Sequence, residues 1–358
     1  MPTDASLKAW LALSLTRGLG GENARCLLKE FGSPEAVFAA STSSLKSIVK
    51  TDVAAEISKG VVDDVIAPTL DWLQDGNNHV VTLADNDYPQ ALLNIPDPPL
   101  LLYVKGRLDL LNHSALAVVG SRNATPQGIR NAEAFARSLS DATLCIVSGM
   151  AHGIDAAAHR GALLGQGSSV AIVGTGLDKV YPAANRELAH ALAAQGALIS
   201  EFPLGTPPLA ANFPRRNRLI SGISIGCLVV EASLQSGSLI TARLASEQGR
   251  DVFAIPGSIH APQSKGCHTL IKQGAKLVET AQDILEELGG QIAAPIQVTG
   301  PLGESFGLLE HIGFDPVDID TLVARCGLTM AELSAMLLTL ELEGRISTLP
   351  GGQYQRIH

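Results

Sequence analysis

The stretch Leu116-Ala-Val-Val-Gly-Ser-Arg-Asn-Ala-Thr-Pro126 decides the fold of this chain. A short apolar run ends in Gly120-Ser-Arg122, and Thr125-Pro126 then supplies a good N-cap and first position for a helix. A strand that passes through a tight glycine turn into a helix is typical of parallel α/β sheets. Because Arg122 follows the strand beside a helix N-terminus, the turn also predicts an anion site.

The same rhythm continues along the middle of the chain. The apolar runs are short and continuous, which is typical of strands that are covered on both faces. They lie at 116–119, 144–147, 170–173, 197–199, 227–230 and 252–255. Helical spans are expected between them, near 127–140, 154–164, 185–195, 214–222 and 239–249. The pattern predicts an α/β fold with an extended Rossmann-like, doubly wound parallel sheet.

Four segments are expected along the chain. Residues 1–75 form a helical domain, because leucines recur there at helical spacing. Residues 80–280 form the sheet domain, and the composition of 281–304 indicates a linker. Residues 305–358 combine helix, glycine turn, helix and hairpin, the pattern of a winged helix. Gly18-Leu-Gly20 in the helical domain is either a plain turn or a helix-hairpin-helix-like phosphate site.

The charge is unevenly distributed over the 358 residues. The whole chain has a formal net charge of −9, which taken alone argues against binding of nucleic acid. Residues 113–280, however, carry 14 basic and 10 acidic side chains, whereas 281–358 carry 3 basic and 11 acidic ones. A polyanion is therefore expected at the middle domain. The acidic winged unit is expected to bind a partner protein or a second copy rather than duplex DNA.

The cysteines and the apolar runs indicate a cytoplasmic protein. The 5 cysteines include no Cys-x-x-Cys pair and predict neither a disulfide framework nor a zinc site. No apolar run approaches the length of a membrane span, and Met-Pro-Thr-Asp at the N-terminus lacks a basic leader region.

Basic and phosphate-compatible residues follow several of the expected strands. Phe213-Pro-Arg215-Arg216-Asn217-Arg218 places three arginines and an aromatic platform together, with no run of acidic residues beside them in the sequence. Arginine forks match phosphates, and an aromatic ring can stack on an unpaired base. Ser236-Gly237-Ser238 opens a helix with free backbone amides, and Lys179 or Arg186 can neutralise a further phosphate.

An enzyme is the competing interpretation of the same loops. Asp155 and His159 are spaced i and i+4, His152 precedes them, and Glu231 follows another strand. These four would serve a nucleotide-processing hydrolase, although a structural hydrogen-bond role fits them better. The Walker and G-x-G-x-x-G patterns are absent, and no metal ligand set is found, so no cofactor is expected.

Ordered motifs in the middle domain closely resemble the DprA (also called Smf) family of DNA-processing proteins. They are Gly120-Ser-Arg122, Ser148-Gly-Met-Ala-His-Gly-Ile-Asp155, Gly174-Thr-Gly-Leu-Asp178, Tyr181-Pro182, Ser200-Glu-Phe-Pro203, Phe213-Pro-Arg-Arg-Asn-Arg218, Glu231-Ala232, Ser236-Gly-Ser-Leu-Ile-Thr-Ala242 and Lys265-Gly266. The helical domain resembles the SAM-like domain of that family, and the last unit resembles its winged helix.

The resemblance implies a binding protein rather than an enzyme. Such a protein binds incoming single-stranded DNA without sequence specificity during natural transformation, protects it, and loads the RecA recombinase onto it. It also implies contact with single-strand binding protein and a homodimer of the Rossmann-like domain. The residues implied for the DNA pocket are Arg122, Phe213, Arg216, Asn217 and Arg218.

The sequence departs from the family pattern at two positions. Ala183 stands where many members carry a basic residue after Tyr-Pro, so Lys179 or Arg186 must substitute for it. His268 stands where asparagine is usual. A nucleotide-processing hydrolase and a double-stranded DNA regulator acting through the winged unit remain the alternatives.

Overall fold

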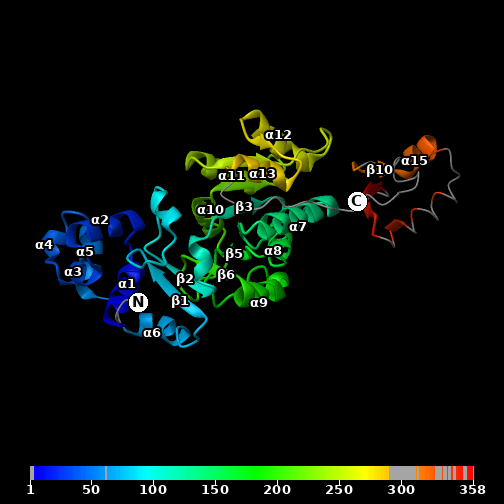
Figure 1. Cartoon of the computed structure of the whole chain (residues 1–358). Coiled ribbons are helices and arrows are strands. Elements are labelled where there is room, and N and C mark those ends of the chain that lie inside the picture. The colour runs from blue at the N-terminus through cyan, green and yellow to red at the C-terminus, as the bar shows by residue number, and fades with distance from the viewer. Residues whose placement is uncertain are drawn as a thin grey trace.

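The computed structural model describes residues 4–60, 63–289, 312, 314–326, 333, 337, 340, 341, 344–349 and 353–357 (Figure 1). Its main feature is a 9-stranded sheet of order β1-β2-β6-β5-β4-β3-β7-β8-β9. The strands are β1 (Asn78–Thr82), β2 (Leu101–Gly106), β3 (Ala115–Val119), β4 (Cys145–Ser148), β5 (Ser169–Ile172), β6 (Ala197–Ser200), β7 (Gly226–Val229), β8 (Asp251–Ala254) and β9 (Lys276–Leu277).

The parallel part of the sheet is doubly wound, as the sequence predicts. From β3 the chain runs outward through β4 and β5 to β6, then returns to the other side of β3 and continues through β7 and β8. The strand order therefore reverses between β3 and β7, which is the switch point where such sheets bind ligands. β1 and β2 extend the sheet in antiparallel fashion beyond β6, a pairing that the sequence did not predict.

Alternate residues of the strands face two separate apolar layers. In β3, Ala117 and Val119 face one layer while Leu116 and Val118 face the other, and all four are buried. The first layer is covered by α10 (Asn212–Ile223), α11 (Ser238–Glu247) and α12 (Lys265–Lys272). The second is covered by α7 (Pro126–Asp141), α8 (Ile154–Ala162) and α13 (Ala281–Glu287). α9 (Arg186–Gln195) packs beside β6.

Helix α13 lies inside the segment that we expected to be a linker from residue 281. Thr280 and Asp283 form a capping box at its start, and Ile284 is fully buried in the layer shared with α7. Ala281, Leu285 and Leu288 are partly buried against the same layer. The start of the expected linker therefore packs on the sheet domain.

Six helices precede the sheet and form a small apolar core of their own. They are α1 (Asp4–Leu15), α2 (Gly21–Phe31), α3 (Pro34–Ala39), α4 (Thr42–Leu45), α5 (Thr51–Lys59) and α6 (Asp63–Trp72). The unit also packs on the sheet, because the rings of Trp72 and Tyr103 meet edge to face at 6.1 Å. Figure 1 shows these helices beyond the β1–β2 end of the sheet.

The C-terminal residues form a separate small unit. β10 (Val317–Asp318), β11 (Ile346–Leu349) and β12 (Gln353–Arg356) make a 3-stranded sheet, and α15 spans Ile319–Cys326. The β11–β12 hairpin supplies the expected wing. The helices expected over 306–312 and 330–343 lie almost entirely outside the described residues. Within the described part of the chain, no helix is long and apolar enough to cross a membrane.

Candidate functional site

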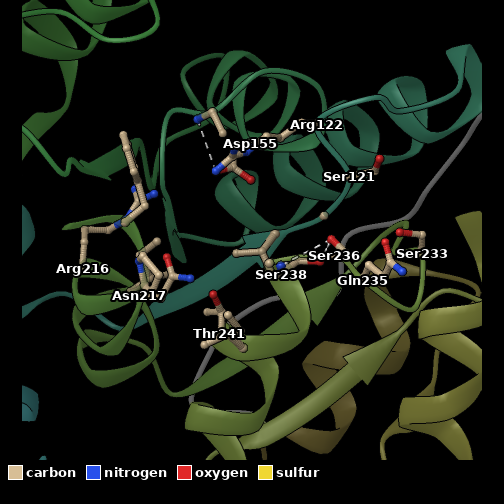
Figure 2. Close-up of a pocket in the computed structure, with 18 of the residues that line it drawn as sticks. Ser121, Arg122, Asp155, Arg216, Asn217, Ser233, Gln235, Ser236, Ser238 and Thr241 are labelled. Carbon is tan, nitrogen blue, oxygen red and sulfur yellow. Dashed lines mark hydrogen bonds between the residues drawn. The ribbon is translucent and has the colours of Figure 1, made fainter. Parts of the chain in front are cut away.

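A hollow of about 630 Å³ opens at the switch point of the sheet (Figure 2). Its walls are the loop after β3, the loop after β4, the first turns of α10, and the loop from β7 into α11. Of the residues expected to bind DNA, the hollow brings together Arg122, Phe213, Arg216, Asn217, Ser236, Gly237 and Ser238. Lys179, Arg215 and Arg218 do not line it.

The loop after β3 brings Arg122 to the rim of the hollow. Gly120 permits this path, because a Cβ there would lie 2.6 Å from Ile154 Cγ1 and 2.9 Å from the Glu231 carbonyl oxygen. The backbone N–H of Ser121 donates to that same carbonyl at 2.7 Å. Arg122 is exposed and forms no ion pair among the described residues. Its charge is therefore available to an anion in the hollow.

Arg216 lies deeper, in the wall of the hollow. Its side chain is almost fully buried and donates to the carbonyl oxygen of Ile172, while its Nε has no hydrogen-bond partner in the described structure. Burial lowers the pKa of Arg216 to about 10, so the guanidinium stays charged at neutral pH. Asp155 is the buried carboxylate nearby, and it accepts from the N–H groups of Gly149 and Ala151 at 3.1 and 3.3 Å.

Two aromatic rings form one side of the hollow. The Phe213 ring lies 5.6 Å from the Tyr181 ring, tilted by 43°, and the Arg122 guanidinium lies 6.0 Å from the Phe213 centroid. Tyr181 is 47% exposed. Tyr181 was not predicted from the sequence as a stacking residue, although its place in the loop after β5 was a usable signal. The two rings provide an aromatic surface beside the two arginines.

The N-terminus of α11 faces the hollow from the opposite side. The helix begins at Ser238 with Gly237 as N-cap. The Ser238 N–H donates to Ser236 Oγ at 3.4 Å, and the Leu239 N–H donates to the Ser236 carbonyl oxygen at 3.2 Å. The hydroxyls of Ser236 and Ser238 lie 2.7 Å apart and line the hollow. The helix dipole favours an anion at this point.

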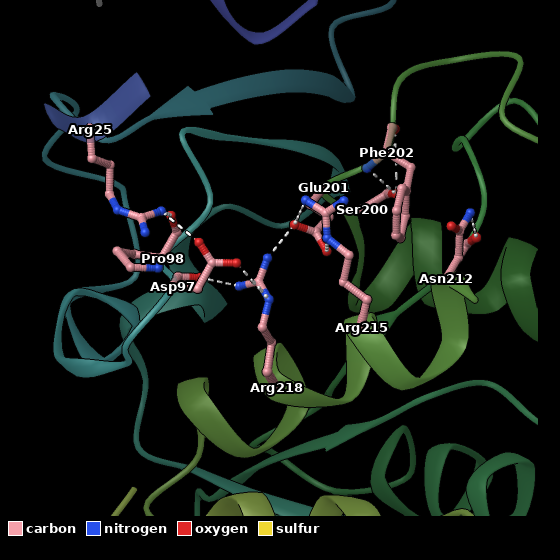
Figure 3. A network of polar contacts seen from close by, with 10 residues as sticks. Arg25, Asp97, Pro98, Ser200, Glu201, Phe202, Asn212, Arg215 and Arg218 are labelled. Carbon is pink, nitrogen blue, oxygen red and sulfur yellow. Dashed lines mark hydrogen bonds and ion pairs between the residues drawn. The ribbon is translucent and has the colours of Figure 1, made fainter. Parts of the chain in front are cut away.

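Arg215 and Arg218 each have an acidic partner, although the sequence indicated none beside them (Figure 3). Both pair with Glu201, which follows β6 and whose side chain is only 3% exposed. Arg215 Nε lies 3.2 Å from Glu201 Oε1, and its guanidinium lies over the Phe202 ring at 5.6 Å. Glu201 and Arg215 are 14 positions apart, so proximity along the chain did not reveal the pair. Arg218 is therefore engaged by Glu201, and its expected contact with DNA stays a prediction.

The remaining basic candidates lie apart from the hollow. Lys179 and Arg186 are exposed, and neither lines it. Ala183 begins a short 3₁₀ turn with Asn185, whose amide donates to the Met150 carbonyl at 2.9 Å. The substitution of Lys179 or Arg186 for a basic residue at 183 therefore stays a prediction.

The suspected catalytic residues are held in structural contacts. His159 is fully buried, hydrogen-bonds Ser169 Oγ through Nδ1 at 2.7 Å, and has its pKa lowered to about 3 by burial. The Glu231 carboxylate accepts from the backbone N–H and hydroxyl of Thr125. His152 is exposed and does not line the hollow. The described residues contain no cluster of three or more metal-ligating side chains.

Fold and site together define a doubly wound α/β protein with a hollow at its switch point that is lined by arginines and aromatic rings. Residues 79–289 match the family of DNA recombination-mediator protein A, and residues 304–352 match the DprA winged helix domain. The chain therefore belongs to the DNA recombination-mediator protein A family, also called DprA or Smf.

Relatives and solved structures agree with this membership. Protein Smf of Escherichia coli is 45% identical over 301 residues, which cover 80% of each chain. DNA processing protein DprA of Streptococcus pneumoniae is 49% identical over 206 residues, 58% of this chain and 73% of that one. The X-ray structure of the S. pneumoniae protein matches with a TM-score of 0.70 at 39% identity, over 80% of this chain and 99% of that one.

A second solved structure bears on a ligand. DNA processing protein A from Helicobacter pylori matches with a TM-score of 0.54 at 30% identity, covering 59% of this chain and 95% of that one. The H. pylori protein has a unique single-stranded DNA binding mode, on which that structure gives insights.

Proposed function

We propose that this chain binds single-stranded DNA in the hollow at the switch point, without sequence specificity and without chemistry on the strand. The observation that carries the proposal is the joint presence of Arg122, Arg216 and the Phe213–Tyr181 pair in one wall. Arginines and the positive end of a helix dipole favour phosphates, while the rings stack on bases. The single-stranded DNA binding of the H. pylori relative supports the same assignment.

A single strand suits the site better than a duplex. Stacking on an aromatic ring requires a base that is not already stacked inside a helix, and it contributes about 1–3 kcal/mol per base with little dependence on sequence. The acidic winged unit, with 7 acidic and 3 basic residues over 305–358, repels duplex phosphates. We therefore assign the winged unit to protein contacts rather than DNA.

The role that follows is that of a recombination mediator in the cytoplasm. The chain protects the bound strand and loads the RecA recombinase onto it during natural transformation, works beside single-strand binding protein, and acts as a homodimer. The family membership and the motif resemblance support this role. The contacts of His159 and Glu231 support a binding protein over a hydrolase, because both side chains are engaged in holding the scaffold.

Fluorescence anisotropy with labelled oligothymidine and a matched duplex tests the proposal. We expect the single strand to bind more tightly, with an affinity that falls as salt rises. Phe213→Ala and Arg122→Gln should each weaken binding of the single strand. Equal affinity for duplex, or thermal stabilisation by nucleoside monophosphates but not by oligonucleotides, would contradict it in favour of the alternatives.

A further inference from the structure

A continuous chain of charges joins the N-terminal helices to helix α10 (Figure 3). Arg25 of α2 donates to Asp97 Oδ1 at 2.7 Å and to the Pro98 carbonyl oxygen at 2.8 Å. Arg218 of α10 donates to the Asp97 carbonyl oxygen, and its Nε lies 3.6 Å from Asp97 Oδ2. We call Arg25, Asp97 and Arg218 the interdomain clasp.

The clasp is partly shielded from water. The side chains of Arg218 and Arg25 are 13% and 22% exposed, whereas that of Asp97 is 45% exposed. Gly21, the first residue of α2, allows this approach, because a Cβ there would lie 3.1 Å from both Arg25 Nη1 and Asp97 Oδ1. Charge-assisted hydrogen bonds of this kind are stronger than exposed ion pairs.

Helix α10 is connected to this clasp through Arg218, in addition to its buried face in the core. No side chain caps its N-terminus at Ala211. The loop that carries Asp97 also packs on the far end of α10, where a Cβ on Gly222 would lie 2.7 Å from Ile95 Cγ2. Arg218 and Arg216 are two positions apart, so they project about 200° from each other around the helix axis. A helix held through Arg218 on one side therefore presents Arg216 to the hollow on the other.

We propose that Arg25 and Asp97 are positioning residues for the binding of single-stranded DNA. Through Arg218 they hold α10 in the orientation that presents Phe213, Arg216 and Asn217 to the strand. The N-terminal helices thereby set the affinity of the hollow with no contact to DNA. This inference rests on the proposed function.

The test compares Arg25→Gln with Arg107→Gln in the full chain. Arg107 is the matched control, because it pairs with Asp109 at 2.6 Å and its guanidinium otherwise donates to the Gln195 carbonyl oxygen of α9 at 3.5 Å. We expect Arg25→Gln to raise the Kd for oligothymidine about three- to tenfold. Arg107→Gln should leave it unchanged. Titration to saturation gives the fraction of protein that is able to bind, so a loss of folded protein is distinguished from a higher Kd. The Asp97→Asn variant tests the same contact by changing its acidic partner.

Two further readouts distinguish positioning from other roles. The salt dependence of Kd should be unchanged in Arg25→Gln, whereas loss of a direct phosphate contact lowers the slope by about 0.7. Arg25→Gln should also raise the Kd by a smaller factor in a Phe213→Ala background than in the wild type, because both substitutions affect α10. Arg25→Lys, which keeps the charge beside Asp97, should restore part of the affinity.

The positioning role would be overturned by any of three results for Arg25→Gln. These are an unchanged Kd, a reduced salt dependence of Kd, or the same fold increase in Kd with and without Phe213→Ala. Failure of the wild-type chain to bind oligothymidine would instead overturn the proposed function itself.

Discussion

Glu231 binds Thr125 through both of its carboxylate oxygens, although 106 residues separate them in the chain. The hydroxyl of Thr125 donates to Oε1 at 2.6 Å, its backbone N–H donates to Oε2 at 2.9 Å, and the same hydroxyl accepts from Gly128 as the cap of α7. The two loops that flank the switch point are thus fixed to each other. The hydrogen bonds between Thr125 and Glu231 therefore join the loop after β3 to the loop after β7, beside the hollow.

Removal of this carboxylate should destabilise the fold. Glu231→Ala leaves the Thr125 amide and hydroxyl without their acceptor, and hydrogen bonds to charged groups contribute about 1.5–3 kcal/mol. We expect the free energy of unfolding in urea to fall by about that amount, and by less in Glu231→Gln. Wild-type stability in Glu231→Ala would show that the pair does not support the frame.

Two exposed arginines near α10 should behave differently. Arg122 lines the hollow without an ion pair among the described residues, whereas Arg215 is paired with Glu201 and stacked on Phe202. Arg122→Gln should weaken oligothymidine binding and lower the salt slope by about 0.7, as expected for one lost phosphate contact. Arg215→Gln should have a much smaller effect on both quantities. The reverse order would place the strand along the Glu201 side of α10.

Loss of the aromatic wall should lower affinity without changing the salt slope. Phe213→Ala removes a stacking surface that contributes about 1–3 kcal/mol, which corresponds to a rise in Kd of about 5- to 150-fold. Phe213→Tyr should retain most of the affinity, and Tyr181→Ala should show a weaker loss. The measurement is anisotropy with oligothymidine and oligoadenosine. A loss confined to one of the two sequences would indicate specific base recognition instead.

Acid should destabilise the chain through His159. Its folded-state pKa of about 3 lies below the ordinary 6.5. Between these two pH values His159 is therefore protonated in the unfolded chain and neutral in the folded chain. The stability due to its neutral form is present above pH 6.5 and is lost as pH falls toward 3. Between about pH 7.5 and 5.5 this amounts to roughly 1 kcal/mol. His159→Gln should flatten the pH dependence of unfolding, whereas the exposed His190→Gln should not.

Removal of the acidic C-terminal unit should tighten DNA binding at low salt. Residues 290–358 have 8 acidic and 3 basic side chains, so they repel a strand approaching the more basic middle domain. Comparison of the full chain with a chain ending at residue 289 keeps α13 in place. The gain should vanish as salt screens the charges. Weaker binding by the shortened chain would assign a direct DNA contact to the winged unit.

Local sequence patterns were sufficient to predict the parallel core of the fold. Each expected strand from 116–119 to 252–255 coincides within one or two residues with β3 to β8, because a strand buried on both faces leaves a short apolar run. The start of α7 after the β3 loop followed from the glycine turn and from Thr125 as the helix cap, whose hydroxyl accepts from Gly128 at 3.0 Å. Both features are encoded within a few adjacent residues.

Features that depend on distant residues were not predictable in this way. Glu201 reaches Arg215 and Arg218 only because β6 ends beside α10, and Asp97 meets Arg25 and Arg218 from a separate loop. The antiparallel addition of β2 to β6 likewise depends on pairing between segments far apart in sequence. Three closely spaced arginines that look alike in the sequence are thereby divided into one that lines the hollow and two that hold the scaffold.

The central claim is tested most directly by a crystal structure of the chain with bound oligothymidine. Our account predicts a phosphate within hydrogen-bonding distance of Arg122 or of the α11 amides, and a base stacked against Phe213 or Tyr181. A strand bound elsewhere on the surface, with the hollow at the switch point left empty, would contradict it.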